Sequence, residues 1–222
     1  MHIPDGFVSN GINVAVSALS LGSCWIAARL TQQRMEEREI PLMGMTAAFI
    51  FASQMVNFPV TGGTSGHMVG AVLAAILLGP WACCLIMALV LTAQCLLFAD
   101  GGLTALGINI FNLGVLGGLG GYGILRILQG ILPQSRGGIL AATSLTAWLS
   151  VILAAAACSL ELVFSGTAPL KATLPLMLGV HSIIGVGEAV ITASIVSFLL
   201  TVRPDLLKGL FPEQPPLLIR RA

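Results

Sequence analysis

The strongest constraint on this chain is its series of apolar segments, which are too long and too numerous for one soluble core. Of its 222 residues, 56% are hydrophobic and only 9% are charged, whereas soluble domains are about one quarter charged. Such segments are typical of helices that cross a hydrocarbon layer about 30 Å thick. The sequence therefore predicts an all-α integral membrane protein without a separate soluble domain.

Prolines, glycines and charged residues divide the apolar sequence into a bundle of about seven transmembrane helices. We expect residues 1–202 to form a single transmembrane domain that opens with a short metal-chelating loop, and residues 203–222 to form a cytoplasmic tail. The predicted spans are 12–30, 42–58, 67–78, 81–98, 108–132, 139–164 and 176–202.

The distribution of basic residues predicts the orientation in the membrane. Lys171 alone falls on one side of a seven-span arrangement, and nine basic residues fall on the other. Lysine and arginine collect on the cytoplasmic side, so we expect the N-terminus outside and the C-terminus inside. The nine are Arg29, Arg34, Arg38, Arg126, Arg136, Arg203, Lys208, Arg220 and Arg221.

Several functional classes lack support in the sequence. The net charge of +1 includes no basic stripe for nucleic acid, and the five cysteines lack the paired spacing of zinc or redox sites. No G-x-x-x-x-G-K-[ST] phosphate loop is present, so any ATP-driven step needs partner subunits. Residues 1–10 contain neither the basic start nor the cleavage site of a signal peptide. We therefore expect a free amine at Met1.

The first two residues form a predicted chelator for a metal ion. The Met1 amine and the His2 amide nitrogen, once deprotonated, close a five-membered ring around one ion. The same amide and His2 Nδ1 close a six-membered ring. Three nitrogens in one plane suit Ni²⁺ or Cu²⁺, which favour tetragonal nitrogen sites. A fourth ligand must come from elsewhere in the chain.

His67 is the candidate for that fourth ligand. A lone histidine at this place is more typical of a membrane interface, but a Met-His terminus on the same side favours the ligand. His67 follows a glycine-rich loop on the same predicted side as His2. A chelate with one ionised amide leaves a net charge of +1 on a divalent ion, so a nearby carboxylate would help. The residues predicted to support the site, either as hydrogen-bonding neighbours or through packing, are Asp5, Ser65, Gln94, Asp100 and Asn109.

Short motifs in the sequence also allow comparison with two other functional classes. Gly63-Thr64-Ser65-Gly66 matches the G-x-S-G of rhomboid-type intramembrane serine proteases, with His181 as a candidate base. Four residues are a weak match in a chain with 26 glycines, and the glycine spacing after His181 misses the pattern of those proteases by one residue. A stand-alone metal permease of the nickel–cobalt type would resemble H-x-x-x-x-D-H, which is absent here.

Four segments together resemble the CbiM/NikM family, the substrate-binding membrane subunits of energy-coupling factor transporters for cobalt and nickel. The resemblance covers residues 1–202 and is most specific where a terminal Met-His combines with a downstream Ser-Gly-His. The segments are Met1-His2-Ile3-Pro4-Asp5-Gly6, Thr64-Ser65-Gly66-His67, residues 98–107 and Gly187-Glu188-Ala189.

The resemblance implies a transport subunit of a prokaryotic cytoplasmic membrane rather than an enzyme. Its implied metal ligands are Met1, His2 and His67, and its cargo is Ni²⁺ or Co²⁺. Its implied partners are a transmembrane coupling subunit, two cytoplasmic ATPases and often a small accessory membrane subunit. Pro4-Asp5 resembles nickel-type relatives more than cobalt-type ones, and planar nitrogen ligation also favours Ni²⁺.

The chelate makes a direct prediction about the N-terminus. Adding one residue before Met1, or acetylating its amine, should abolish tight Ni²⁺ binding because either change moves the amine out of chelate register. Equilibrium dialysis measures the loss, and mass spectrometry confirms that Met1 is retained without its formyl group. The same residue added after Ala222 serves as the control. Tight binding by the N-terminally extended form would exclude the chelate.

Overall fold

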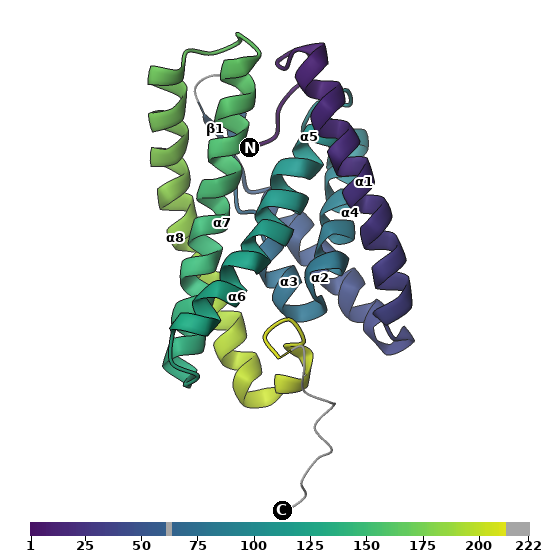
Figure 1. Ribbon diagram of the computed structural model, residues 1–222, viewed down its shortest axis with the longest axis vertical. Coiled ribbons are helices and arrows are strands. Elements are labelled where there is room, and N and C mark those ends of the chain that lie inside the picture. The colour runs from purple at the N-terminus through teal and green to yellow at the C-terminus, as the bar shows by residue number, and fades with distance from the viewer. Residues whose placement is uncertain (61–63, 212–222) are drawn as a thin grey trace, which may run out of the picture.

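A computed structural model of the chain describes residues 1–60 and 64–211 as one elongated bundle of helices (Figure 1). A two-stranded hairpin lies at the end of the bundle that holds the N-terminus, and the described chain finishes at the opposite end. The helices are α1 Asn10–Arg34, α2 Ile40–Gln54, α3 Ala71–Leu78, α4 Pro80–Phe98, α5 Leu106–Ile110, α6 Gly121–Ile131, α7 Arg136–Phe164 and α8 Leu170–Val202. The smaller elements are β1 Phe58–Val60, β2 Thr64–Gly66, the turns η1 Glu37–Glu39 and η3 Pro204–Leu206, and the π-helical segment η2 Phe111–Gly120.

Five helical segments of the described chain are long and apolar enough to cross a membrane. Four are single helices, and the fifth joins α5, η2 and α6 into one continuous segment. The predicted apolar spans all contain a helix, but α2 has 15 residues and α3 only 8. The prediction of a multi-pass helical membrane protein is confirmed, whereas its count of seven crossing helices is not.

The prediction for the third span was wrong at its start. Residues 67–70 are not helical, and α3 begins only at Ala71. At 1.5 Å per residue, its 8 residues rise about 12 Å, well short of the hydrocarbon thickness. The second span also ends earlier than predicted, at Gln54. The chain between these helices is extended, with Pro59 paired to Ser65 in the antiparallel hairpin. His67 therefore lies on extended chain directly after β2.

Helix α3 lies in the centre of the bundle. Its first seven residues are buried, and it packs against α4, η2, α6 and α7. Glycines of η2 and α6 make this close packing possible. A Cβ added at Gly118 would lie 2.7 Å from Cys83 Sγ, and one added at Gly121 would lie 3.0 Å from Val72 Cγ2. Glycine at these positions lets helix backbones approach closely inside the membrane.

The beginning of the predicted cytoplasmic tail packs onto the bundle. Gly209 N donates a hydrogen bond of 2.8 Å to Ile76 O near the end of α3, and the side chains of Leu207 and Leu210 are buried. Residues 212–222, including the predicted cytoplasmic Arg220 and Arg221, lie outside the described residues.

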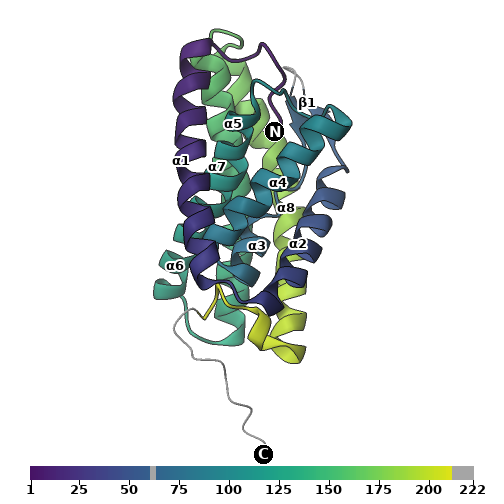
Figure 2. The same cartoon turned by 90° about the vertical axis from the view of Figure 1, so that its right-hand side faces the viewer.

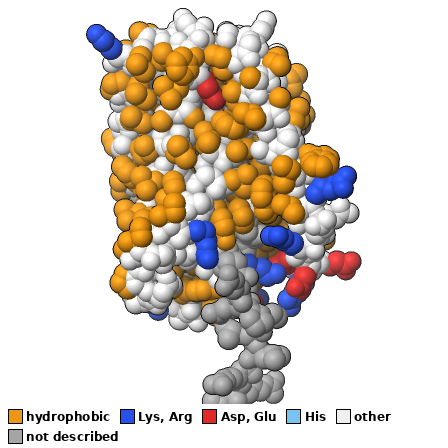
Figure 3. Space-filling view, in the orientation of Figure 1, with side chains coloured by type: hydrophobic (Ala, Val, Ile, Leu, Met, Phe, Trp, Pro, Cys, Tyr) orange, Lys and Arg blue, Asp and Glu red, His pale blue; other side chains and the backbone are white. Residues whose placement is uncertain are grey.

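The molecular surface is that of a membrane protein. Hydrophobic side chains cover the middle of the bundle (Figure 3), and several large ones are more than 70% exposed, among them Leu97 and Ile183. On the face shown, the Lys and Arg side chains gather toward the lower end, apart from one at the upper corner. Lipid is the environment in which such a surface is stable, so the long helices place this chain in a membrane.

Candidate metal centre

The N-terminal segment runs into the bundle instead of lying on it (Figure 2). The side chains of Met1 and Ile3 are fully buried, and His2 is 3% exposed. Asn109 of α5 holds this segment through the backbone of Ile3. Ile3 N donates to Asn109 Oδ1 at 2.8 Å, and Asn109 Nδ2 donates to Ile3 O at 3.1 Å. Gly102 N donates to the same carbonyl at 2.9 Å. The N–H and C=O groups of Ile3 are therefore both hydrogen-bonded, as they would be in a β-sheet, but mainly to the side chain of Asn109.

The loop after α4 fits closely around residues 2–5. A Cβ at Gly102 would lie 2.7 Å from the carbonyl carbon of Pro4, so only glycine fits there. Asp5 Oδ1 accepts hydrogen bonds from Thr104 Oγ1 at 2.5 Å and from Thr104 N at 2.7 Å. These bonds hold the pKa of the Asp5 carboxyl below its usual value. Asp5 therefore anchors the turn that directs the first two residues inward.

The Met1 amine lies against Ser65 of strand β2. It donates hydrogen bonds to the Ser65 carbonyl and, at 3.2 Å, to Ser65 Oγ. The His2 amide nitrogen lies 3.4 Å from the same hydroxyl, a long contact. Burial lowers the pKa of the amine to about 5, with Cys158 and Asp100 opposing the shift. The amine is thus neutral at pH 7 and has a lone pair to offer.

The rings of His2 and His67 are neighbours, with their centroids 4.3 Å apart and their planes tilted by 42°. His67 Nδ1–H donates to Met68 O at 2.7 Å, which fixes the tautomer and leaves the Nε2 lone pair free. Nε2 is buried without a hydrogen-bond partner among the described residues. Burial lowers the pKa of both imidazoles, that of His67 most strongly. Two neutral imidazoles therefore lie beside the neutral amine.

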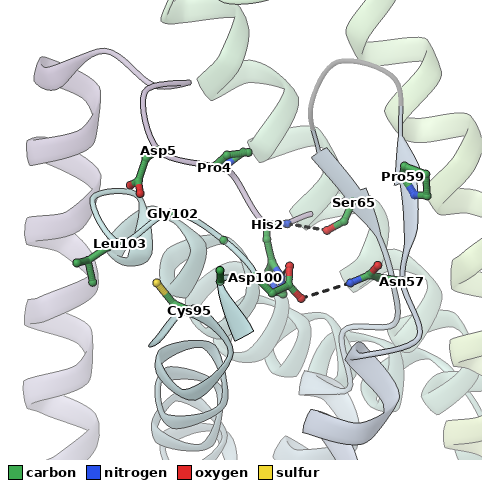
Figure 4. A pocket seen from close by; sticks show the side chains of 12 residues that line it. His2, Pro4, Asp5, Asn57, Pro59, Ser65, Cys95, Asp100, Gly102 and Leu103 are labelled. Atoms are coloured by element: carbon green, nitrogen blue, oxygen red, sulfur yellow. Dashed lines mark hydrogen bonds and ion pairs between the residues drawn. The ribbon is translucent and has the colours of Figure 1, made fainter. Parts of the chain in front are cut away.

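Asp100 faces His2 from the loop after α4. Asp100 Oδ1 lies 2.8 Å from His2 Nδ1, and Asn57 Nδ2 donates to Asp100 Oδ2 at 3.4 Å (Figure 4). Burial raises the pKa of the Asp100 carboxyl, but its interactions with His2, the Met1 amine and Asn57 together outweigh burial and hold that pKa below its usual value. His2 Nδ1, the ring atom of the predicted chelate, therefore faces Asp100. Chelation through this atom requires that the carboxylate contact be exchanged for the ion.

A cavity of about 510 Å³ lies over this arrangement (Figure 4). His2, Asp100 and Ser65 are in its wall, together with Asp5 and Asn57. A cation that enters the cavity meets carboxylates before it meets the buried nitrogens, so the order of charges favours the entry of positive ions.

Two further polar residues, Gln94 and His181, are fully buried in the structure. The Gln94 carbonyl accepts a hydrogen bond from Asp100 N at 3.1 Å. The Gln94 side chain is fully buried, with no hydrogen-bond partner among the described residues. His181 is the candidate base of the serine protease considered above. It is fully buried on α8, where its Nδ1–H donates to Met177 O at 2.8 Å.

The geometry does not support the serine protease. Within the described chain, the Ser65 hydroxyl has hydrogen bonds with the Met1 amine and the His2 amide, and none to His181. No group of three or more histidine, cysteine or acidic side chains in residues 1–60 and 64–211 could hold a metal ion. The nitrogens that the structure brings together are the imidazoles of His2 and His67 and the Met1 amine.

Fold and site together define a multi-pass membrane protein with a buried cluster of neutral nitrogens beneath an acidic cavity. The family model for the cobalt uptake substrate-specific transmembrane region, CbiM, matches residues 2–206. The chain belongs to this family, whose members are membrane components of metal transport and not enzymes.

Individual relatives agree with this assignment. A protein of Archaeoglobus fulgidus, provisionally named fused nickel transport protein NikMN, is 41% identical over 94% of this chain and 68% of its own. Cobalt transport protein CbiM of Sorangium cellulosum is 33% identical over 95% of this chain and 96% of its own. A crystal structure described as a transition metal transporter has a TM-score of 0.84 and 31% identity, covering 97% of this chain and all of that one.

The close fit of Gly102 predicts that Gly102→Ala loosens the N-terminus. Its Cβ would collide with the backbone of Pro4 and Asp5, at a cost of about 1–3 kcal/mol. We expect a lower melting temperature in detergent and at least tenfold faster acylation of the Met1 amine by a water-soluble reagent, followed by mass spectrometry. Gly123→Ala, which meets no atom within 4 Å, is the matched control. An acylation rate equal to that of the control would contradict this account.

Proposed function

We propose that this chain is the substrate-specific membrane subunit of an energy-coupling factor importer, and that it captures Ni²⁺ from outside. Co²⁺ is the second candidate for the ion. The observation that carries the proposal is the cluster of neutral nitrogens, Met1 amine, His2 and His67, buried beneath an acidic cavity.

Four nitrogens would hold the ion in one plane. They are the Met1 amine, the ionised His2 amide, His2 Nδ1 and His67 Nε2. Among the described residues the His2 amide makes only the long contact to Ser65 Oγ and no hydrogen bond to a carbonyl, so its proton can leave without breaking a backbone pairing there. His67 Nε2 has no competing hydrogen-bond partner among the described residues. A planar set that includes an ionised amide favours Ni²⁺ over Co²⁺.

Asp100 would balance the charge. The bound ion with one ionised amide carries a net charge of +1, and the carboxylate that faces His2 Nδ1 lies next to it. On arrival of the ion, Asp100 would give up the ring nitrogen and remain as a close counter-charge. Asn109, Ser65 and Asp5 would keep the N-terminal segment in chelate register through the hydrogen bonds described above.

Energy for uptake would come from partner subunits, because the chain has no phosphate-binding loop. The resemblance to energy-coupling factor systems suggests a transmembrane coupling subunit, two cytoplasmic ATPases and a small accessory membrane subunit. The relatives named as nickel and cobalt transport proteins support this class of cargo. Uptake of labelled Ni²⁺ and Co²⁺ by cells that produce the chain with these partners tests both the coupling and the choice of ion.

Substitution of the histidines separates ligands from neighbours. His2→Ala and His67→Ala should each weaken Ni²⁺ binding by more than the roughly 100-fold that loss of an outer hydrogen bond costs, and should abolish the visible absorption of planar nickel. His181→Ala should retain most of the affinity because His181 is outside the proposed ligand set. Isothermal titration calorimetry measures all three. A loss with His181→Ala equal to that with His67→Ala would contradict the set.

The low pKa of the amine predicts how many protons binding releases. With the Met1 amine at about 5 and both imidazoles below their usual pKa values, only the His2 amide has a proton to lose at pH 7. The affinity for Ni²⁺ should therefore rise about tenfold per pH unit between pH 6 and 8, and more steeply below pH 5. Calorimetry in buffers of different ionisation enthalpy counts the protons. A free Met-His peptide, with its amine near pKa 8, should release about two at pH 7; equal counts for protein and peptide would contradict the prediction.

A further inference from the structure

The peptide backbone two residues after His67 is held from both sides by buried side chains. Glu188 of α8 accepts hydrogen bonds from Val69 N at 2.6 Å and from Gly70 N at 2.7 Å, one on each carboxyl oxygen. Gln54 of α2 donates from Nε2 to Val69 O at 2.8 Å. Both side chains are fully buried. Two helices thus hold one peptide segment between them.

Such a contact is expensive in a membrane protein. A carboxyl group inside a membrane bundle is rare and costly, and its position usually has a function. Capping the first turn of α3 accounts for part of this contact, because the N–H groups at a helix start lack partners within the helix. It does not account for Gln54, which holds the carbonyl of Val69 from the opposite side.

The contact of Glu188 and Gln54 with the Val69 backbone also restricts His67, which is only two residues away. Consecutive Cα atoms are about 3.8 Å apart, so a fixed Val69 leaves His67 little freedom. Met68 supplies the carbonyl that orients the His67 ring, with Nδ1–H donating to it at 2.7 Å. Each group from Glu188 to His67 Nε2 is thus linked to the next by a hydrogen bond or by covalent chain.

We propose that Glu188 and Gln54 are positioning residues that hold His67 Nε2 in place for the metal ion. This inference rests on the proposed function, because it takes His67 as a ligand. Glu188 acts from α8 and Gln54 from α2, so the fourth ligand keeps its place only while these two helices keep their spacing. A relative shift of α8 and α2 would withdraw His67 and leave the N-terminal chelate with three nitrogens.

The central experiment uses Glu188→Gln with Glu161→Gln as a matched control. A glutamine at 188 has one acceptor oxygen for two N–H donors, so one hydrogen bond is lost. Glu161 is also buried in a long helix, and its Oε2 accepts from Asn112 Nδ2 at 2.6 Å, a bond that a glutamine oxygen can keep. Ni²⁺ affinity and dissociation rate are measured in detergent for the full chain. We expect Glu188→Gln to weaken binding about 10- to 100-fold, mainly through faster dissociation, and Glu161→Gln to stay within about twofold of the parent.

A double-mutant cycle distinguishes positioning from a general loss of stability. In a His67→Ala background, Glu188→Gln should cause no further loss of Ni²⁺ affinity, because the residue that it positions is already absent. An equal loss in both backgrounds, or an unchanged affinity in the parent background, overturns the positioning role. Failure of the proposed function gives a different result, since His67→Ala alone would then bind Ni²⁺ as the parent does.

Gln54→Met tests the opposite side of the same peptide and decides the matter if Glu188→Gln does not fold. Methionine keeps the length of the side chain but removes the donor to Val69 O. Weaker Ni²⁺ binding that disappears in the His67→Ala background supports the proposal. Parent affinity in Gln54→Met, with the variant folded, overturns it.

Discussion

Extended backbone inside a membrane bundle is the constraint on which the rest of this structure depends. Peptide groups that have neither water nor a helical partner must be satisfied by other parts of the protein. Residues 1–3 and 67–70 are both of this kind. Asn109 and Gly102 satisfy the first segment, and Glu188 and Gln54 satisfy the second. The polar residues within the apolar helices are explained largely by this need.

The same constraint brings the nitrogens together. A helical N-terminus would keep its peptide nitrogens within its own hydrogen bonds. The extended segment instead presents the Met1 amine and the His2 amide to the interior, beside His67. Burial keeps the amine and both imidazoles neutral. Protonation of these nitrogens is therefore unfavourable in the metal-free site. Asp100 lies in the wall of the cavity beside His2, where its negative charge attracts a metal cation.

Much of this arrangement could be predicted from the sequence, because its signals are local. Met1 and His2 are adjacent, so their chelate ring sizes follow from covalent geometry alone. Low charge and long apolar segments predict the membrane helices in the same way. The prediction that His2 and His67 lie together depends in addition on the assumption that both are on one side of the membrane. The structure places their rings 4.3 Å apart. The roles of these residues as ligands remain a prediction.

The features of the fold and the site that the sequence does not predict depend on contacts between residues distant in sequence. Nothing near Asn109 indicates that its amide pairs with the Ile3 backbone 106 positions away. Glu188 resembles any costly polar residue in a helix until Val69 and Gly70 are seen beside it. Hydropathy also merged residues 67–70 with α3, because His67 and its neighbours adjoin an apolar run without a strong breaker. The hairpin cannot be predicted from the sequence, since its three-residue strands are too short to show an alternating pattern.

The shortness of α3 has a consequence for how the protein is assembled. A helix of 8 residues cannot be recognised and inserted as an independent membrane segment, because its rise is less than half the hydrocarbon thickness. It must enter its central place after the longer helices are in the membrane. Its first turn is completed by Glu188 from α8, and its last by Gly209 beyond that helix, so both contacts need residues made more than 100 positions after α3. The segment that holds His67 beside His2 is thus fully supported only after α8 has been made, and chains truncated before α8 would lack this support.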